Sequence, residues 1–314
     1  MEWLSQRSSM RRADHRGFPS RLGFLIEGNI VVVGAPGSGL ASKKPGEQLM
    51  DLRLKDKTVL ITGSSRGIGL ATAKAFAAEG CHIVLSARSA GGLAKAEAVL
   101  RAGSAAVATQ VADVTQPEQA AQLIETAVAA FGGIEILVNN VGGGRGGSRI
   151  ADSTDEDWRA VFEVNLVQTV RMMRLALPYM SGRAGAAVVN VASISGWSPQ
   201  LAMAGQYGAA KAALIYATER WALEFVAHGI RVNTVSPGSV LAEGNGWDRY
   251  RAANPANFDD YVRHGFPMGR LGTVEEIADV IAFLASPRAH WINGRNIPVD
   301  GLEQPYAPVG RRPF

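Results

Sequence analysis

Tyr207 and Lys211 are four positions apart, a spacing that places both side chains on one face of a helix. An ammonium group beside a phenol favours the phenolate and lowers a pKa that is ordinarily about 10. Such a phenol is suited to general acid/base catalysis on alcohols and carbonyls. A lone pair of this spacing can also be a solvated pair on a helix surface, so its meaning depends on the rest of the chain.

A glycine-rich turn supplies a second group of chemical interest. Residues 58–61 form an apolar run, residues 70–79 are predicted to be helical, and the turn between them is Thr62-Gly63-Ser64-Ser65-Arg66-Gly67-Ile68-Gly69. Glycines at a strand-turn-helix junction let the backbone approach a pyrophosphate, and the N-terminus of the helix then binds this anion. Taken alone, the stretch can also be a glycine-rich turn without a ligand.

Three further signatures, Asn139-Asn140-Val141-Gly142, Asn165 and Ser193, lie between this turn and Tyr207-Gly208-Ala209-Ala210-Lys211. On these five signatures, residues 50–301 resemble a classical short-chain dehydrogenase/reductase. The likeness extends to 3-oxoacyl-acyl-carrier-protein reductases and to sugar and cyclic-alcohol dehydrogenases of that family.

The resemblance implies a catalytic tetrad. In it, Tyr207 donates or accepts the proton at the substrate oxygen, and Ser193 hydrogen-bonds that oxygen. Lys211 holds the nicotinamide ribose and lowers the tyrosine pKa, while Asn165 anchors a water of a proton relay. Two alternatives stay open: Asn165 can cap or kink its helix, and Ser195 competes with Ser193, which is preferred because it ends an apolar strand pattern.

The charge after the second predicted strand, residues 82–87, bears on the cofactor. Ala87 stands where the resemblance places the acid of NAD-binding relatives, Arg88 follows it, and Arg66 adds a second cation. An arginine at this place favours a 2'-phosphate, so NADP(H) is expected and NAD(H) stays possible. Solvated arginines are the alternative. The resemblance also assigns to the cofactor Asp113, Val114, Asn140, Gly142, Tyr207, Lys211, Pro237, Gly238 and Val240.

The substrate is expected to bind outside the carboxyl ends of the strands, under a lid of residues 239–268 that is rich in aromatic side chains. Several of these aromatics can instead pack against the core or a neighbouring subunit. The candidate pocket residues are Arg145, Ser193, Trp197, Met203, Tyr207 and Trp247. Arg145 can meet an anionic group of the substrate or remain solvated.

Three positions depart from the family pattern. Ala242 stands where many relatives have a threonine whose hydroxyl contacts the nicotinamide carboxamide, so this contact is expected from the backbone or from another residue. The chain also has Asn140-Val141-Gly142 in place of Asn-Ala-Gly, and Asp300-Gly301-Leu302 in place of the usual Asp-Gly-Gly. None of these changes touches the tetrad.

Composition excludes several function classes. The formal charge is +4, but residues 1–49 carry +3 of it, so the remainder has no basic tract that indicates nucleic-acid binding. Cys81 is the single cysteine, which leaves no intramolecular disulfide, and the five histidines lack the spacing of metal ligands. We therefore expect no metal, no membrane span and a cytoplasmic enzyme that acts on a small molecule.

The chain is predicted to have two parts. Residues 1–49 are an N-terminal extension, either dispensable or preceding a natural start at Met50, with an extra β-structure or a targeting peptide as alternatives. Residues 50–314 are one α/β domain with a three-layer, doubly wound Rossmann fold. By the resemblance, its seven mainly parallel strands follow the order 3-2-1-4-5-6-7, and the enzyme is a homotetramer or homodimer.

Helix starts are predicted from capping boxes. Thr115 with Glu118 predicts the start of a helix that runs to Phe131, and Thr273 with Glu276 predicts another that ends near Ala285.

The sequence thus favours an NADP(H)-dependent reductase of a ketone, or dehydrogenase of the matching secondary alcohol. An NAD(H)-dependent alcohol dehydrogenase is the alternative within enzymes. A non-catalytic dinucleotide sensor or scaffold on the same fold is the alternative outside them, because fold does not fix function.

Overall fold

The structure is a computed structural model that describes residues 51–147, 149–199 and 204–303. The chain divides into two units, Met1–Leu49 and Met50–Phe314, and the first lies outside the described residues. The predicted extension is therefore not described. None of the helices in the described ranges is long and apolar enough to cross a membrane.

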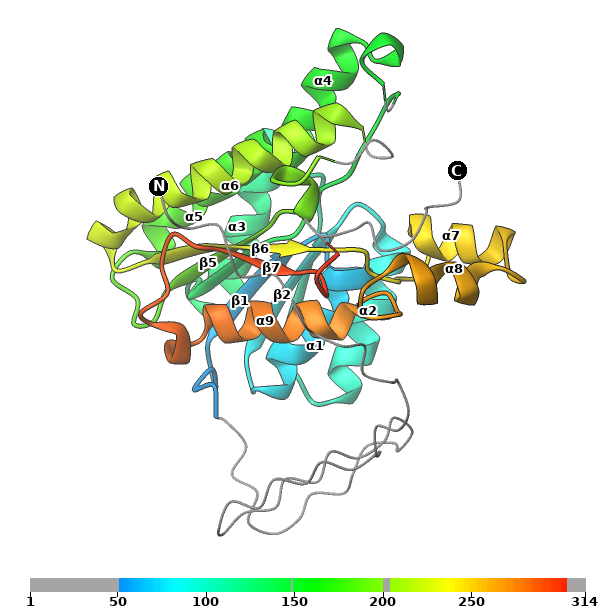
Figure 1. Cartoon of the computed structure of the whole chain (residues 1–314). Helices are drawn as coiled ribbons and strands as arrows, with labels where there is room; N and C mark the ends of the chain where they lie inside the picture. Colours follow the sequence, from blue (N-terminus) through cyan, green and yellow to red (C-terminus); the bar gives the residue numbers. More distant parts are fainter. Residues whose placement is uncertain (1–50, 148, 200–203, 304–314) are drawn as a thin grey trace, which may run out of the picture. The chain divides into compact units, whose positions relative to one another are not determined.

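Strands of the described domain form one sheet in the order β3-β2-β1-β4-β5-β6-β7, and neighbouring strands pair in parallel (Figure 1). This confirms the predicted doubly wound fold and its strand order. The central strands are buried on both faces, which is why they read as continuous apolar runs and not as an alternation. The strands are β1 (Thr58–Thr62), β2 (His82–Ala87), β3 (Val107–Val111), β4 (Ile136–Asn139), β5 (Ala187–Val191), β6 (Arg231–Pro237) and β7 (Asn296–Val299).

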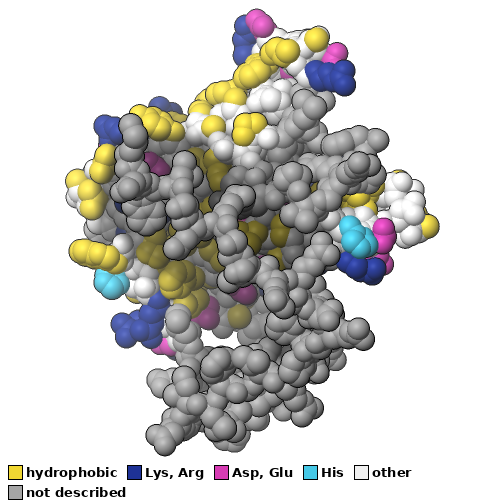
Figure 2. Space-filling view, in the orientation of Figure 1, with side chains coloured by type: hydrophobic (Ala, Val, Ile, Leu, Met, Phe, Trp, Pro, Cys, Tyr) yellow, Lys and Arg dark blue, Asp and Glu magenta, His cyan; other side chains and the backbone are white. Residues whose placement is uncertain are grey.

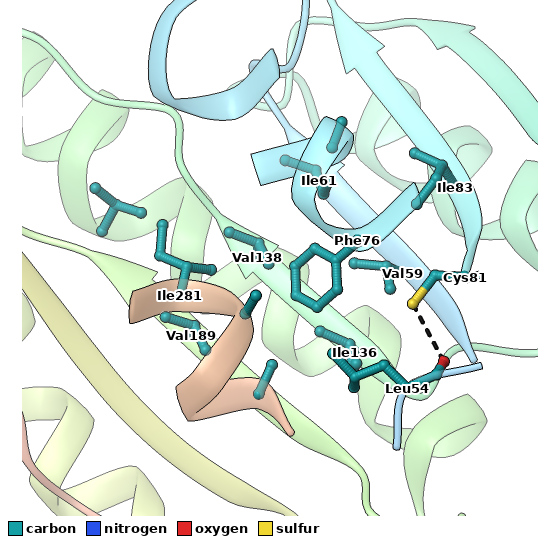
Figure 3. Close-up of a cluster of buried hydrophobic side chains, with 14 of the residues drawn as sticks. Leu54, Val59, Ile61, Phe76, Cys81, Ile83, Ile136, Val138, Val189 and Ile281 are labelled. Atoms are coloured by element: carbon teal, nitrogen blue, oxygen red, sulfur yellow. Dashed lines mark hydrogen bonds between the residues drawn. The ribbon is translucent and has the colours of Figure 1, made fainter. Parts of the chain in front are cut away.

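Helices cover both faces of the sheet (Figure 1). One face carries α1 (Gly67–Ala78), α2 (Ala90–Ala102) and α9 (Val274–Ala285), and the other carries α3 (Pro117–Phe131), α5 (Gln168–Met180) and α6 (Gly205–Phe225). Two hydrophobic cores result. In the first, Phe76 of α1 packs among side chains from β1, β4, β5 and α9 (Figure 3). The second contains Leu60, Leu137 and Met172. Neighbouring residues of one strand therefore pack into opposite cores.

One of the two predicted capping boxes is present. The Thr273 side chain accepts from the Glu276 amide, and the Glu276 side chain accepts from the Thr273 amide, as predicted for α9. The box at Thr115 is wrong, because its hydroxyl donates to Asp113 at 2.7 Å and Gln116 is the N-cap of α3. Pro117 occupies the first position of that helix, where it needs no N–H partner, and so fixes the start one residue later.

Candidate active site

Tyr207 and Ser193 meet where the helix α6 approaches the short 3-10 helix η3 (Ile194–Gly196). Ser193 caps η3, and its hydroxyl hydrogen-bonds the Tyr207 phenol. The approach is close because a Cβ on Gly196 would lie 2.8 Å from the Lys211 carbonyl carbon, and one on Gly208 would lie 2.9 Å from the Ser195 oxygen. Glycine at these two positions therefore lets the serine reach the tyrosine.

The Tyr207 phenol is tuned differently from the expectation. Burial raises its pKa above the ordinary value of 10.0, and the hydrogen bond with Ser193 offsets part of that rise. Lys211 does not produce the expected lowering: its Nζ lies 5.8 Å from the centre of the tyrosine ring and donates to the Val191 carbonyl at 2.8 Å. In the protein described here, Ser193 is thus the residue that favours the phenolate.

Lys211 is itself strongly perturbed. Its side chain is only 2% exposed, and burial lowers its pKa from 10.5 to about 7. The residue lies one turn of α6 after Tyr207, on the same face, as its spacing predicts. Because this pKa is near neutrality, a charged group that binds beside Lys211 would change the protonation of the amine.

Asn165 lies in the π-helical turn η2 (Glu163–Val167), which joins α4 (Asp155–Phe162) to α5. Its amide donates to the carbonyls of Gly143 and Val161, both at 2.8 Å, and its oxygen accepts from the Gly143 amide at 3.0 Å. The side chain thus shapes the helix, as one alternative holds, and fixes the loop after β4. A π-turn of this kind is common at functional sites.

Gly142 brings two tetrad members to one place. A Cβ at this position would lie 2.8 Å from the Asn165 oxygen and 2.8 Å from the Lys211 Nζ. The glycine therefore lets both polar groups flank the loop backbone at the end of β4.

The glycine turn fits a dinucleotide phosphate. Gly63 and Gly67 have φ of +67° and +57°, and a Cβ on Gly69 would lie 2.5 Å from the Gly63 carbonyl oxygen. The Asn140 side chain donates to the carbonyls of Thr62 and Gly63, which holds the turn against β4. The cradle between β1 and the start of α1 is thus shaped by residues that have no room for side chains.

Of the two arginines predicted to bind the 2'-phosphate, Arg66 lies in this cradle and Arg88 follows the neighbouring strand. Arg66 is the N-cap residue of α1, and its guanidinium lies 2.7 Å from the place that a Cβ of Gly244 would take. Arg88 follows β2 directly and is exposed. Among the described residues, neither arginine forms an ion pair. Ser65 packs against the position of Gly92 at the start of α2.

Two predicted cofactor contacts, Asp113 and Val114, form hydrogen bonds within the protein. The Asp113 carboxylate accepts from the amide and the hydroxyl of Thr115 at 3.0 and 2.7 Å. The Val114 side chain is buried in the second core, and its carbonyl accepts from Arg171 at 2.9 Å. Both residues hold the loop after β3, so a ligand would meet the surface of this loop.

A cavity of about 300 Å³ opens at the carboxyl ends of the central strands. It brings together many of the predicted residues, namely Ile68, Asn140, Gly142, Ser193, Tyr207, Lys211, Pro237, Gly238, Val240 and Trp247. Three polar residues in its lining were not predicted: Ser239, Asn245 and Glu303. Ser239 and Asn245 belong to the predicted lid, whereas nothing in the local sequence marks Glu303, because its partner is far away in the chain.

The remaining substrate candidates lie elsewhere. Arg145 is exposed, with its Nε 3.9 Å from an Asp157 oxygen, and Trp197 is 41% exposed; neither lines the cavity. Met203 lies outside the described residues.

The predicted lid contains two short helices, α7 (Gly246–Ala253) and α8 (Phe258–Gly265). Its aromatic side chains pack mainly on one another, with ring centroids 5.5–6.3 Å apart. We call this group the lid cluster; its members are Trp247, Tyr250, Phe258, Tyr261 and Phe266. Only Trp247 of the cluster also lines the cavity.

Comparison with known proteins agrees with this geometry. A family model described as enoyl-(acyl carrier protein) reductase matches residues 63–301. The chain belongs to the short-chain dehydrogenase/reductase family. It is 32% identical to mouse dehydrogenase/reductase SDR family member 4, over 84% of this chain and 90% of that protein. It is also 33% identical to the 3-oxoacyl-[acyl-carrier-protein] reductase of Thermotoga maritima, over 80% and 98%.

Among solved structures, the short-chain dehydrogenase/reductase chain is similar to L-sorbose reductase from Gluconobacter frateurii in complex with NADPH and L-sorbose. The TM-score is 0.76 and the identity 34%, over 82% of this chain and 100% of that one. The resemblance seen in the sequence therefore extends to the arrangement of the elements.

Proposed function

We propose that this protein is an NADP(H)-dependent oxidoreductase that reduces a ketone or oxidises the matching secondary alcohol. The observation that carries the proposal is the meeting of Tyr207, its hydrogen-bond partner Ser193 and Lys211 in one cavity beside the glycine turn. A sensor or scaffold has no need of a phenol, a hydroxyl and an amine converging in a cavity.

Each residue has a separate task in this reaction. Tyr207 gives its proton to the carbonyl oxygen in the reductive direction and takes it back in the oxidative one. Ser193 donates a hydrogen bond to the same oxygen and stabilises its developing negative charge. Lys211 holds the nicotinamide ribose, and Asn165 fixes the loop after β4 and anchors a water of the proton relay. NADP(H) supplies the hydride when it is bound, and the glycine turn cradles its phosphates.

Replacing the phenol tests the mechanism. Tyr207→Phe should lower kcat about 10²- to 10⁴-fold, since a positioned general acid contributes that much. The assay follows NADPH absorbance with a panel of ketones. Tyr216→Phe, which changes an exposed tyrosine of the same helix, is the matched control. Equal turnover by Tyr207→Phe and the control would reject the proposed role.

The preference for NADP(H) rests on Arg66 and Arg88 and on the absence of an acid at Ala87. The NADPH in the similar L-sorbose reductase supports it. Thermal stability measured against NADPH and NADH tests it, because at equal concentration the ligand that binds more tightly stabilises the folded state more, by RT ln(1 + L/Kd) at free ligand concentration L. Arg88→Ala should weaken NADPH about 10- to 100-fold and leave NADH nearly unchanged. Arg220→Ala removes a charge on α6 and is the control; a parallel loss for both cofactors in Arg88→Ala would contradict the assignment.

We also propose a homotetramer built on α5 and α6. Exposed apolar side chains gather along these helices, on the rim where Figure 2 shows hydrophobic side chains. On α6 and the turn after it, Tyr216, Leu223 and Val226 are 60–77% exposed. Light scattering should give the mass of four chains, and Leu223→Glu should lower it, because a buried unpaired charge is costly. A monomeric mass for the unmodified protein would reject this assembly.

A further inference from the structure

Ser239 is the most firmly held polar residue of the cavity that the catalytic scheme does not use. Its amide donates to the Glu303 Oε2 at 2.6 Å, its hydroxyl donates to the Glu303 Oε1 at 2.8 Å, and its carbonyl accepts from the Gly272 amide at 2.9 Å. Both Ser239 and Glu303 line the cavity that contains Tyr207, and both also line a second cavity of about 160 Å³. All three hydrogen-bonding groups of the serine are thus fixed from within the protein.

Glu303 is built into this place. The residue is 6% exposed and follows the turn after β7. This turn places it beside Ser239, although the two residues are 64 positions apart in the chain. Gly238 makes the approach possible, because a Cβ there would lie 2.8 Å from the Glu303 Oε2. A buried carboxylate that receives an N–H and an O–H from one residue fixes the direction of that hydroxyl.

The direction of the hydroxyl decides what it can bind. Because the Ser239 hydroxyl donates its proton to the Glu303 carboxylate, the hydroxyl oxygen has only lone pairs left with which to bind a ligand. We propose that Ser239, oriented by Glu303, is an acceptor site for an N–H or O–H donor of the bound ligands. This inference rests on the proposed function, since the ligands are those of the reaction.

Two donors are available at this end of the cavity. One is the amide N–H of the nicotinamide carboxamide; the other is a hydroxyl next to the carbonyl of the substrate. The first is favoured because Ala242 offers no hydroxyl, and its methyl group lies 3.9 Å from the position of a Cβ on Gly67, against the glycine turn. Ser239 then supplies the contact that Ala242 cannot make.

Binding measurements separate the two donors. Calorimetry gives the affinity of Ser239→Ala and of the unmodified protein for NADPH and for 2'-phospho-ADP-ribose, which lacks the nicotinamide. If the carboxamide is the donor, NADPH should bind about 3- to 10-fold more weakly to the variant, while the fragment binds equally. If a substrate hydroxyl is the donor, both affinities stay, and kcat/KM falls about 3- to 10-fold for 3-hydroxybutan-2-one but not for butan-2-one.

Two further variants make the result specific. Glu303→Gln keeps the shape but lets the amide donate to Ser239, so the hydroxyl turns its proton to the cavity and the same ligand is weakened. Ser236 of β6 does not line the cavity, and Ser236→Ala removes the hydrogen bond of 2.6 Å that its hydroxyl donates to Asn296 of β7. This control should lower Tm and change neither the NADPH affinity nor the kcat/KM for either ketone.

The outcomes distinguish the two proposals. The acceptor site is overturned, and the proposed function stays intact, if the unmodified protein binds NADPH and reduces ketones while Ser239→Ala changes neither the NADPH affinity nor the kcat/KM for 3-hydroxybutan-2-one relative to butan-2-one. Failure of the unmodified protein to bind either NADPH or NADH overturns both.

Discussion

Two regions border the cavity and are held together by different forces. One is the lid, and the other is the part around Tyr207, with Asn165, Gln206 and the loops that they bind, which we call the catalytic wall. Around Tyr207, buried polar side chains tie loops to helices: Asn165 binds the backbone of Gly143, and Gln206 donates to the carbonyls of Arg145 and Gly147 at 2.8 and 3.2 Å. The lid cluster consists of aromatic rings in contact with one another. Hydrogen bonds require set distances and angles, whereas offset and edge-to-face ring contacts form over centroid separations of about 4.5–7 Å.

This difference assigns the two regions different work. Proton transfer needs hydrogen-bonding atoms at fixed distances, so the wall that carries Tyr207 is built from directional bonds. Entry and exit of a ligand need a cover that moves as a unit, and a cluster packed mainly on itself can do so. Three measurements test the contrast.

The largest effect should come from Lys211, because burial of its ammonium lowers the stability of the folded state. Folded protein releases this proton at a pKa of about 7, and the unfolded chain releases it near 10.5. Unfolding therefore takes up a proton between these values, so the free energy of unfolding falls as pH falls, by up to about 1.4 kcal/mol per unit. In Lys211→Met this dependence should vanish, and the variant should be the more stable protein near pH 7.

Urea denaturation at several pH values between 7 and 10 measures this difference. Lys95→Met is the control, because Lys95 is exposed on α2 and its ammonium remains in water in both states. A gap between Lys211→Met and the unmodified protein that is the same at every pH would show that the buried amine carries no such cost.

A smaller effect, on kcat/KM, should follow when η3 is moved away from α6. Gly196→Ala places a Cβ 2.8–2.9 Å from backbone atoms of Lys211 and Ala212, so the short helix must move and carry Ser193 away from Tyr207. We expect kcat/KM to fall about 10²-fold, the usual result of a misplacement of about 1 Å. Gly205→Ala is the matched control, because no atom of the described part of the chain lies within 4 Å of its Cβ. If both variants keep full activity, the wall is less rigid than its bonds imply.

The smallest effect should come from loosening the lid cluster. Tyr261 contacts the rings of Trp247, Tyr250 and Phe266 but does not line the cavity. Tyr261→Leu should raise KM about 3- to 10-fold and change kcat little, since each aromatic pair contributes about 0.5–1.5 kcal/mol. Steady-state kinetics measures both constants, and Tyr261→Phe, which keeps the ring, should match the unmodified enzyme. A drop in kcat alone would place the lid with the catalytic wall.

Much of the fold could be predicted because its signals are local. Apolar runs mark the strands, and the glycine turn marks the first strand-helix junction. The start of α3 was predicted wrongly because two local signals competed there, the hydroxyl of Thr115 and the ring of Pro117, and Asp113 offered the hydroxyl a better partner. A correct family resemblance did not settle such a detail.

The site was less predictable where it depends on distant pairs. Glu303 meets Ser239 only once β6 and β7 are paired, so no window of sequence contains both. The tuning of Tyr207 likewise depends on burial, which the spacing to Lys211 does not reveal. The roles of the tetrad and of the arginines remain predictions until the variants above are measured.

Cys81 gives the molecule a built-in chemical reporter. Its thiol is 2% exposed and donates to the Leu54 carbonyl at 3.2 Å (Figure 3), and burial raises its pKa to about 12. Alkylating reagents attack thiolates, so they should reach Cys81 only when the segment before β1 separates from the end of α1. A cysteine placed on the lid can therefore carry a fluorophore without removal of the native one, and slow labelling at Cys81 in the same sample measures how often the segment before β1 separates from the end of α1.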